Sequence, residues 1–424
     1  MQRRTFLAAG TSAFLCAKAA PSGRIGVGMI GLGRQAMGAN LKPFLASPDT
    51  QVVAVCEADA WRLEKGRAAV EEFYGKQSPA GRYRGCKVYR DFRELLRDPA
   101  VDAVMISTPD HWHVPMSIAA AEAGKDVSCE KPLTRSIAEG RRLSDAMRRR
   151  ERVFRTDSEF RSLPNFHRAC ELVRNGAIGK LRIIRTGVPA GDVGCPPQTA
   201  MPVPPELDYE RWQGPAPRAP YTEKRVHTPH SYDRPGWMRH LYYCDGMITN
   251  WGAHLNDIAQ WGNGTDRTGP VEVEGRGNYP PAESFWNVLL DFEVQYRFAN
   301  GVRMIYSTGK PFVQFAGEGG EIYAEYPKTL SAKPASVLET KLGPNAVRFP
   351  LKSDKQDFID AVRTRGHTLE DAEVGHRTTS LCHLGHIAIR TGKKLEWDPA
   401  RERLTNDEAA NRWVKEPIRD PRNG

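Results

Sequence analysis

A glycine-rich turn near the N-terminus has the residue types and the spacing that bind a dinucleotide. Gly31-Leu32-Gly33-Arg34-Gln35-Ala36 follows an apolar run at 25–30 and precedes a helical pattern. A side chain at Gly31 would block the tight turn, one at Gly33 would keep the backbone from a pyrophosphate, and the small Ala36 lets helix and strand pack closely. The helix N-terminus offers N–H groups and a positive dipole end to the phosphates. The segment therefore predicts a bound NAD or NADP.

The acidic residue Glu57 stands at the end of the next apolar run. A carboxylate there accepts hydrogen bonds from the adenosine ribose and repels a 2′-phosphate, which favours NAD over NADP. Arg34 acts against this preference, because a cation beside the glycine turn can receive a phosphate. NAD is the expected cofactor, and NADP stays compatible with these residues.

The segment 24–156 alternates short apolar runs with amphipathic stretches, which predicts βαβ units and a doubly wound parallel sheet. Ser136, with Glu139 three residues later, forms a capping box that marks a helix start. The expected strands and helices lie at 25–30, 52–56, 101–107 and 126–129, and at 91–97 and 112–123.

The segment 157–398 predicts a second, α+β domain. Residues 189–235 carry 11 of the 31 prolines and indicate a long ordered loop or lid. Beyond it, strand patterns around turn signals favour a large open-faced, mostly antiparallel sheet, and helices return near the C-terminus before a tail at 399–424. The expected strands lie at 272–276, 287–298, 302–308 and 320–325, and the helices at 355–363 and 371–391.

The first 23 residues have the layout of a twin-arginine export signal, with Arg3-Arg4 ahead of a mildly apolar stretch and small residues. A periplasmic or extracellular location is expected. No apolar run approaches the ~20 residues of a membrane-spanning helix. The formal net charge of +10 is spread along the chain without a basic stripe, so no nucleic-acid partner is expected. The cysteines show no paired or CxxC spacing, which argues against a disulfide framework.

Four segments together resemble the glucose-fructose oxidoreductase and inositol dehydrogenase superfamily. The order and spacing of these segments cover nearly the whole chain after the signal. The resemblance implies a Rossmann domain followed by an open-faced sheet domain, with the active site between them and a sugar or cyclitol facing the nicotinamide. The segments are Gly31-Leu32-Gly33-Arg34, Ser107-Thr108-Pro109-Asp110-His111-Trp112-His113, Cys129-Glu130-Lys131-Pro132 and Asn250-Trp251-Gly252-Ala253-His254 with Asp257.

The resemblance assigns the proton chemistry to Lys131 and His254. Oxidation of a secondary alcohol removes the hydroxyl proton while hydride leaves the same carbon, and a lysine amine in a desolvated cleft can take that proton. In the family, the histidine lies four residues after an aspartate, a position that Asn250 occupies here. An amide cannot hold an imidazolium by charge, so Lys131 is the better candidate base.

The remaining site residues follow from the same resemblance. The cofactor side is expected to include Thr108, Pro109, His111, His113 and Glu130. The alternating histidines suggest a metal, but no third ligand of fitting spacing is nearby, and none is predicted. The substrate side is expected to include Arg161, Trp212, Arg239, Tyr242, Asn250 and Asp257.

Three functions are compatible with these residues. The favoured one is an NAD(P)-dependent oxidoreductase acting on a secondary hydroxyl of a sugar, cyclitol or sugar derivative. The first alternative is a glycosidase that works by transient ring oxidation, elimination and re-reduction, and the second is a non-catalytic sugar or nucleotide sensor. Because free NAD is scarce outside the cytoplasm, a tightly bound cofactor is expected. A homo-oligomer is also expected, because an open sheet commonly buries its uncovered face.

Overall fold

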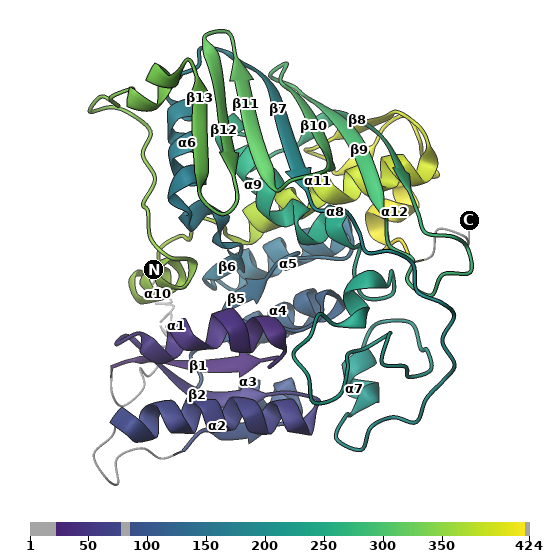
Figure 1. Ribbon diagram of the computed structural model, residues 1–424. Helices are drawn as coiled ribbons and strands as arrows, with labels where there is room; N and C mark the ends of the chain where they lie inside the picture. Colours follow the sequence, from purple (N-terminus) through teal and green to yellow (C-terminus); the bar gives the residue numbers. More distant parts are fainter. Residues whose placement is uncertain (1–22, 78–84, 420–424) are drawn as a thin grey trace, which may run out of the picture.

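A computed structural model describes residues 23–77 and 85–419 of the chain. The polypeptide forms a six-stranded sheet in its N-terminal part and a nine-stranded sheet in its C-terminal part (Figure 1). This arrangement confirms the predicted Rossmann half followed by an α+β half. All but the last residue of the predicted export signal, 1–23, lies outside the described residues. Within the described ranges, every helix is too short or too polar to cross a lipid bilayer.

The N-terminal sheet is entirely parallel and has the strand order β3-β2-β1-β4-β5-β6. The order reverses between β1 and β4, and ligands of such sheets bind outside the carboxyl ends of the strands at this switch point. Strands β4, β5 and β6 are buried throughout; β4 is an unbroken apolar run, as buried parallel strands usually are, whereas β5 and β6 also bury polar and charged side chains. The strands are β1 (Ile25–Ile30), β2 (Thr50–Cys56), β3 (Lys87–Tyr89), β4 (Ala103–Ile106), β5 (Asp126–Glu130) and β6 (Phe154–Asp157).

Helix starts in this half follow local capping chemistry. Asp91 accepts a hydrogen bond from the backbone N–H of Arg93, and Ser136 accepts one from Glu139. The Glu139 carboxylate reaches back to the N–H of Arg135, one residue earlier than a capping box requires. The helix after the glycine turn contains a π-helical segment, Ala36–Asn40, before it continues as α1 (Leu41–Ala46). The other helices are α2 (Ala60–Gln77), α3 (Phe92–Arg97), α4 (His113–Glu122) and α5 (Ile137–Arg149).

The C-terminal sheet has the order β13-β12-β11-β7-β10-β9-β8-β14-β15. Most neighbours are antiparallel, as predicted, but β7 and β10 pair in parallel at the centre. The expected strand at 287–298 is shorter, and β7, β11, β13, β14 and β15 have no counterpart among the predicted strands. The strands are β7 (Leu181–Val188), β8 (Pro270–Asn278), β9 (Asp291–Phe298), β10 (Arg303–Thr308), β11 (Phe312–Gly317), β12 (Gly320–Glu325), β13 (Thr329–Lys333), β14 (Leu395–Asp398) and β15 (Arg403–Leu404).

Helices cover only one face of this sheet and separate it from the Rossmann half (Figure 1). Along β9 the buried Val294 and Tyr296 alternate with Glu293, Gln295 and Arg297, which point to the uncovered face. Along β9 the uncovered face therefore carries charged side chains, and the expected homo-oligomer that would bury this face stays a prediction. The packing helices are α6 (Pro164–Arg174), α8 (Met247–Asn250), α9 (Gly252–Asn263) and α11 (Ala372–Thr391).

Two C-terminal segments depart from the predicted domain limits. Helix α10 (Asp354–Thr364) was expected within the second domain, but its Phe358 and Ile359 pack into the core of the Rossmann sheet, with Phe358 edge-on to Phe44. The expected tail after 398 forms β15 and α12 (Asn411–Lys415), whose buried Val414 belongs to the core of the second domain. Burial of the apolar side chains in both segments lowers the free energy of the folded protein. Their position in the sequence does not determine which of the two cores they pack into.

Candidate active site

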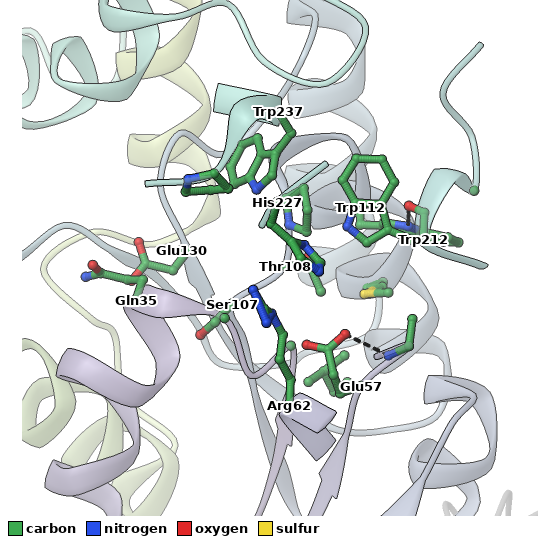
Figure 2. Close-up of a pocket in the computed structure, with 18 of the residues that line it drawn as sticks. Gln35, Glu57, Arg62, Ser107, Thr108, Trp112, Glu130, Trp212, His227 and Trp237 are labelled. Carbon is green, nitrogen blue, oxygen red and sulfur yellow. Dashed lines mark hydrogen bonds between the residues drawn. The ribbon is translucent and has the colours of Figure 1, made fainter. Parts of the chain in front are cut away.

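A cavity of about 360 Å³ opens at the carboxyl ends of the Rossmann strands (Figure 2). The glycine turn forms its floor, the β4–α4 and β5–α5 turns form one wall, and the proline-rich segment 189–235 closes the opposite side. Its lining includes Gly31, Gly33, Arg34, Glu57, Arg62, Thr108, Pro109, Asp110, Trp112, Glu130, Lys131, Trp212, Tyr232, Trp237 and Asn250.

The glycine turn is open to a ligand at Gly33 and tightly packed against the protein at Gly31. Gly31 has a φ of +85°, and a Cβ there would lie 2.7 Å from the carbonyl of Ser107. A Cβ on Gly33 would meet no atom within 4 Å, so the backbone is open toward the cavity. Ala36 is fully buried against the sheet. This cradle fits the predicted pyrophosphate beside the helix N-terminus.

Glu57 lies where the adenosine ribose is expected. Its carboxylate accepts hydrogen bonds from the N–H groups of Leu32 and Ala58, both at 2.7 Å, and thereby ties β2 to the glycine turn (Figure 2). Each carboxylate oxygen has two lone pairs, so acceptor capacity remains for ribose hydroxyls. The position supports the predicted preference for NAD.

Arg62, in the first turn of α2, points into the same cavity (Figure 2). Its guanidinium donates to the Ser231 carbonyl at 2.7 Å and lies 4.0 Å from Asp59. Among the described residues, its Nη1, the atom nearest Asp59, and the Thr108 hydroxyl are buried polar atoms that make no hydrogen bond. Unpaired buried donors beside a cavity are what a bound polar ligand satisfies, so these atoms fit the nucleotide. Arg62 was not predicted, although its place just after Glu57 was a usable signal.

We expect Glu57→Ala to weaken NADH binding by roughly 10-fold to 100-fold, because a hydrogen bond to a charged group is worth about 1.5–3 kcal/mol. NADPH binding should fall less or rise, because the repulsion of the 2′-phosphate is removed. Quenching of tryptophan fluorescence by each nucleotide measures both affinities. Glu57→Gln is the matched control, because it keeps the shape of the side chain and one acceptor oxygen but removes the charge. Equal losses for the two nucleotides would exclude a role in discrimination.

Lys131 lies at the end of β5, where the cavity passes from the Rossmann half to the second domain. Its Nζ donates to Asn250 through the backbone oxygen at 3.2 Å and the side-chain oxygen at 3.4 Å. Glu130 accepts from the Asn40 amide at 2.8 Å and from the Lys131 backbone N–H at 3.2 Å. Glu130 thus shapes the turn that carries the amine, and Asn40 is a supporting residue that no sequence pattern indicated.

His254 is buried next to this turn but does not line the cavity. Its Nδ1 lies 2.8 Å from the Ser158 hydroxyl, and its ring stacks on Phe160 at 4.3 Å. Burial, together with the charge of Lys131, holds the pKa of His254 well below its usual range. The imidazole is therefore neutral near pH 7, in agreement with the expectation that it is not the strong base.

The histidines of the β4–α4 turn lie behind the cavity wall. His111 contacts the Trp212 carbonyl at 3.1 Å, and burial lowers its pKa to about 3. His113 bridges the carbonyls of Pro132 at 2.8 Å and Thr108 at 2.9 Å. Neither ring lines the cavity, which argues against the predicted cofactor contact. Both rings instead fix the backbone of the turns that do line it.

Arg161 and Asp257 form a buried ion pair outside the cavity. The guanidinium donates to the two carboxylate oxygens at 2.7 and 2.6 Å, and Arg161 also contacts Asp266 at 3.2 Å. Both side chains are almost completely buried. This placement argues against the predicted contact with substrate, because each charge already has its partner.

Of the other predicted substrate residues, Trp212 and Asn250 line the cavity, whereas Arg239 and Tyr242 do not. Arg239 pairs with Asp192 at 2.6 Å and lies over the ring of Trp286 at 4.4 Å. The charge of Arg239 is thus paired within the second domain. Asp110 lines the cavity without having been predicted as a site residue, and burial raises the pKa of its carboxyl to about 8.

The parallel sheet, the glycine cradle and Glu57 define a dinucleotide-binding Rossmann protein. Two models of one family match the chain: "Oxidoreductase family, NAD-binding Rossmann fold" over residues 25–158, and "Oxidoreductase family, C-terminal alpha/beta domain" over residues 192–423. The chain belongs to the Gfo/Idh/MocA oxidoreductase family, which confirms the family resemblance and the NAD-type cofactor.

Curated relatives match over part of their length. The chain is 35% identical over 128 residues to myo-inositol 2-dehydrogenase of Thermotoga maritima, covering 30% of this chain and 35% of the relative. It is 38% identical over 95 residues to levoglucosan dehydrogenase of Pseudarthrobacter phenanthrenivorans, covering 22% and 24%. A glycosyl hydrolase family 109 protein of Shewanella is 36% identical over 113 residues, covering 27% and 24%. The chain spans well under half of these relatives.

Solved structures share the fold over nearly the whole chain. The aldose-aldose oxidoreductase from Caulobacter crescentus superposes with a TM-score of 0.62 at 18% identity, covering 88% of this chain and 99% of that one. A levoglucosan dehydrogenase in complex with NADH and levoglucosan gives 0.61 at 18% identity, with the same coverage. At this identity the likeness shows the fold alone.

Proposed function

We propose that the protein is an NAD(P)-dependent oxidoreductase that acts on a secondary hydroxyl of a sugar, a cyclitol or a sugar derivative. The observation that carries the proposal is the Lys131 amine at the wall of the dinucleotide cavity, held there by Asn250. The names of the inositol and levoglucosan dehydrogenase relatives support a carbohydrate substrate.

The chain's own residues supply proton transfer and orientation. Bound NAD supplies the hydride acceptor. The two Asn250 oxygens accept hydrogen bonds from the Lys131 nitrogen. That nitrogen keeps a third site for a substrate hydroxyl, which is a lone pair in the amine and an N–H group in the ammonium. Lys131 takes the hydroxyl proton during oxidation and returns it during reduction. The neutral His254, held by Ser158, keeps a second positive charge away from Lys131.

A second candidate is the glycosidase that oxidises a ring transiently, eliminates the glycosidic bond and reduces the product. The family 109 relatives favour it, and it uses the same cavity. The two candidates differ in net redox change. Incubation with myo-inositol or levoglucosan would produce NADH if the protein is a dehydrogenase, whereas release of p-nitrophenol from nitrophenyl glycosides without net NADH would support the glycosidase. A protein that binds NAD but converts neither class would support the sensor.

We further propose that the protein is exported and keeps its cofactor bound. The Arg3-Arg4 signal supports export to the periplasm or beyond. Slow release is supported by the proline-rich segment, whose Ser231 accepts from Arg62 and whose His227 contacts Asp59 at 3.1 Å, so that it is held against α2 beside the cavity.

Denaturation of the purified protein, followed by mass spectrometry of the released nucleotide, tests the retained cofactor. About one equivalent of NAD per chain is expected, because a tightly bound ligand survives purification. Cytoplasmic protein produced without residues 1–23 is the control for loading before export. A chain that carries no nucleotide and binds none when NAD is added would remove the central proposal.

A further inference from the structure

The turn between β5 and α5 ends at Arg135, a buried side chain that the proposed function does not yet use. Its guanidinium reaches the second domain, where it donates to the Leu241 carbonyl at 2.8 Å. Its Nε lies 3.3 Å from Oδ2 of Asp245, and both side chains are almost completely buried. Among the described residues these two atoms make no hydrogen bond, so their attraction is one of charge. Arg135 therefore ties a turn of the Rossmann half to the second domain.

The same two segments carry the contact on which the proposed function depends. Lys131 lies four residues before Arg135 in its turn, and Asn250 lies five residues after Asp245, at the end of α8. The Lys131 amine contacts Asn250, and the Arg135 guanidinium contacts the chain ahead of α8. Two contacts restrict the relative position of two segments more than one does, because a single contact lets them rotate about it.

Asp245 is also held from its other side, by two hydrogen bonds in series. Nδ1 of the buried His386, in α11, lies 3.2 Å from Oδ1 of Asp245. Nε2 of the same ring lies 2.9 Å from the hydroxyl of Tyr279, which directly follows β8. A neutral imidazole satisfies both partners when its Nδ1 donates to the carboxylate and its Nε2 accepts from the tyrosine. Asp245 is thus fixed between Arg135 and helix α11.

The charges agree with a permanent ion pair. Burial raises the pKa of Asp245, but Arg135 and His386 outweigh burial and hold this pKa at about 2. The Asp245 carboxylate is therefore ionised near neutral pH, and a guanidinium is always charged. Burial lowers the pKa of the neighbouring His383 to about 4, so that its ring adds no positive charge near pH 7.

We infer that the Arg135–Asp245 ion pair positions Lys131 for proton transfer. The inference rests on the proposed oxidoreductase function. The pair holds the lysine turn against the segment that leads into α8, so that Nζ of Lys131 stays on the two Asn250 oxygens while it exchanges a proton with the substrate. Arg135 and Asp245 do not line the cavity and are positioning residues. A misplacement of about 1 Å at a reacting group can cost about 10²-fold in rate.

The position of the Lys131 amine can be measured without turnover. Arg135→Met with Asp245→Asn, the pair variant, removes both charges, so that no unpaired charge stays buried. Competitive acetylation read by mass spectrometry should label Lys131 several times faster in the pair variant than in the wild type, because Asn250 no longer holds the amine. The exposed Lys180 is the internal standard. An unchanged or slower rate at Lys131 would overturn the inference, whatever the enzyme turns over.

Arg141 and Glu373 supply the matched control, because their ion pair also joins the two halves, at 2.7 Å between α5 and α11. Arg141→Met with Glu373→Gln should leave the labelling of Lys131 unchanged. Faster labelling in this control too would indicate a general loosening of the two halves and would overturn a specific role of the pair.

Tyr279→Phe is the second variant and serves if the pair variant folds poorly. It removes one hydroxyl at the outer end of the hydrogen-bonded series and keeps the ring. His386 then loses one of its two partners and holds Asp245 less firmly. Labelling of Lys131 should rise by a smaller factor than in the pair variant. If the pair variant does not fold and Tyr279→Phe gives no rise, the inference is overturned.

Turnover gives the second readout, with myo-inositol or levoglucosan as the probe substrate. The pair variant should lower kcat by about tenfold to 10²-fold. Its affinity for NADH should stay unchanged, because the glycine turn and Glu57 are untouched. In a Lys131→Met background the same two changes should cause no further loss, because the amine that they position is absent. A purely structural role would instead multiply the two losses, and that result would overturn the inference. If the wild type converts neither probe, the proposed function fails, whereas the labelling experiment still tests the position of Lys131.

Discussion

Replacement of Lys131 by Met is expected to lower kcat by about 10²-fold to 10⁴-fold, the usual contribution of a positioned general acid or base. The thioether matches the length of the lysine stem but cannot exchange a proton. NADH should still bind, because the glycine turn and Glu57 are untouched. Steady-state kinetics with a probe cyclitol, together with a fluorescence titration of the nucleotide, measure the two quantities separately.

Lys131→Arg distinguishes proton transfer from charge. An arginine keeps the positive charge and can still donate to Asn250, but it does not lose its proton near neutral pH. It should therefore be nearly as inactive as Lys131→Met. The exposed Lys180 provides the control, and Lys180→Met should behave as the wild type. Full activity in Lys131→Arg would mean that the lysine acts only through its charge, and full activity in Lys131→Met would remove it from the mechanism.

The largest expected loss of stability comes from Arg161→Met. Removing one partner of a buried ion pair leaves the other charge desolvated and uncompensated, which typically costs about 3–5 kcal/mol. Asp257 would be the unpaired buried charge. Its other hydrogen-bond partner, the Thr378 hydroxyl at 3.3 Å, is a neutral donor. Urea denaturation followed by circular dichroism measures the change in the free energy of unfolding.

The double variant Arg161→Met with Asp257→Leu is the informative control. With both charges gone, the loss should be clearly smaller than for Arg161→Met alone, because no unpaired charge stays buried. A side chain that contacts substrate would behave differently, since its removal would raise KM and leave stability unchanged. That second pattern would restore the prediction that Arg161 belongs to the substrate site.

Structure that depends on residues close together in the chain could be predicted from the sequence. Residues a few positions apart form the strand 25–30, the glycine turn and the helix start at Ser136, and all three occur where the sequence predicts them. Strand β7 was missed, because Arg182 and Arg185 interrupt its apolar pattern. Its partners, β10 and β11, lie more than one hundred residues further along the chain, and only their pairing makes it a central strand.

The same distinction separates the parts of the site. The sequence by itself determined the cofactor cradle, because Gly31 needs a positive φ, Gly33 must stay bare and Glu57 must end the next strand. The order of motifs also identified Lys131. Only the tertiary structure decided which charges meet a counter-charge and which face the cavity: Arg161 pairs with Asp257, whereas Lys131 lies in the cavity lining. Charges interact through space, so whether such a residue faces a ligand or a counter-charge depends on how distant segments of the chain pack together.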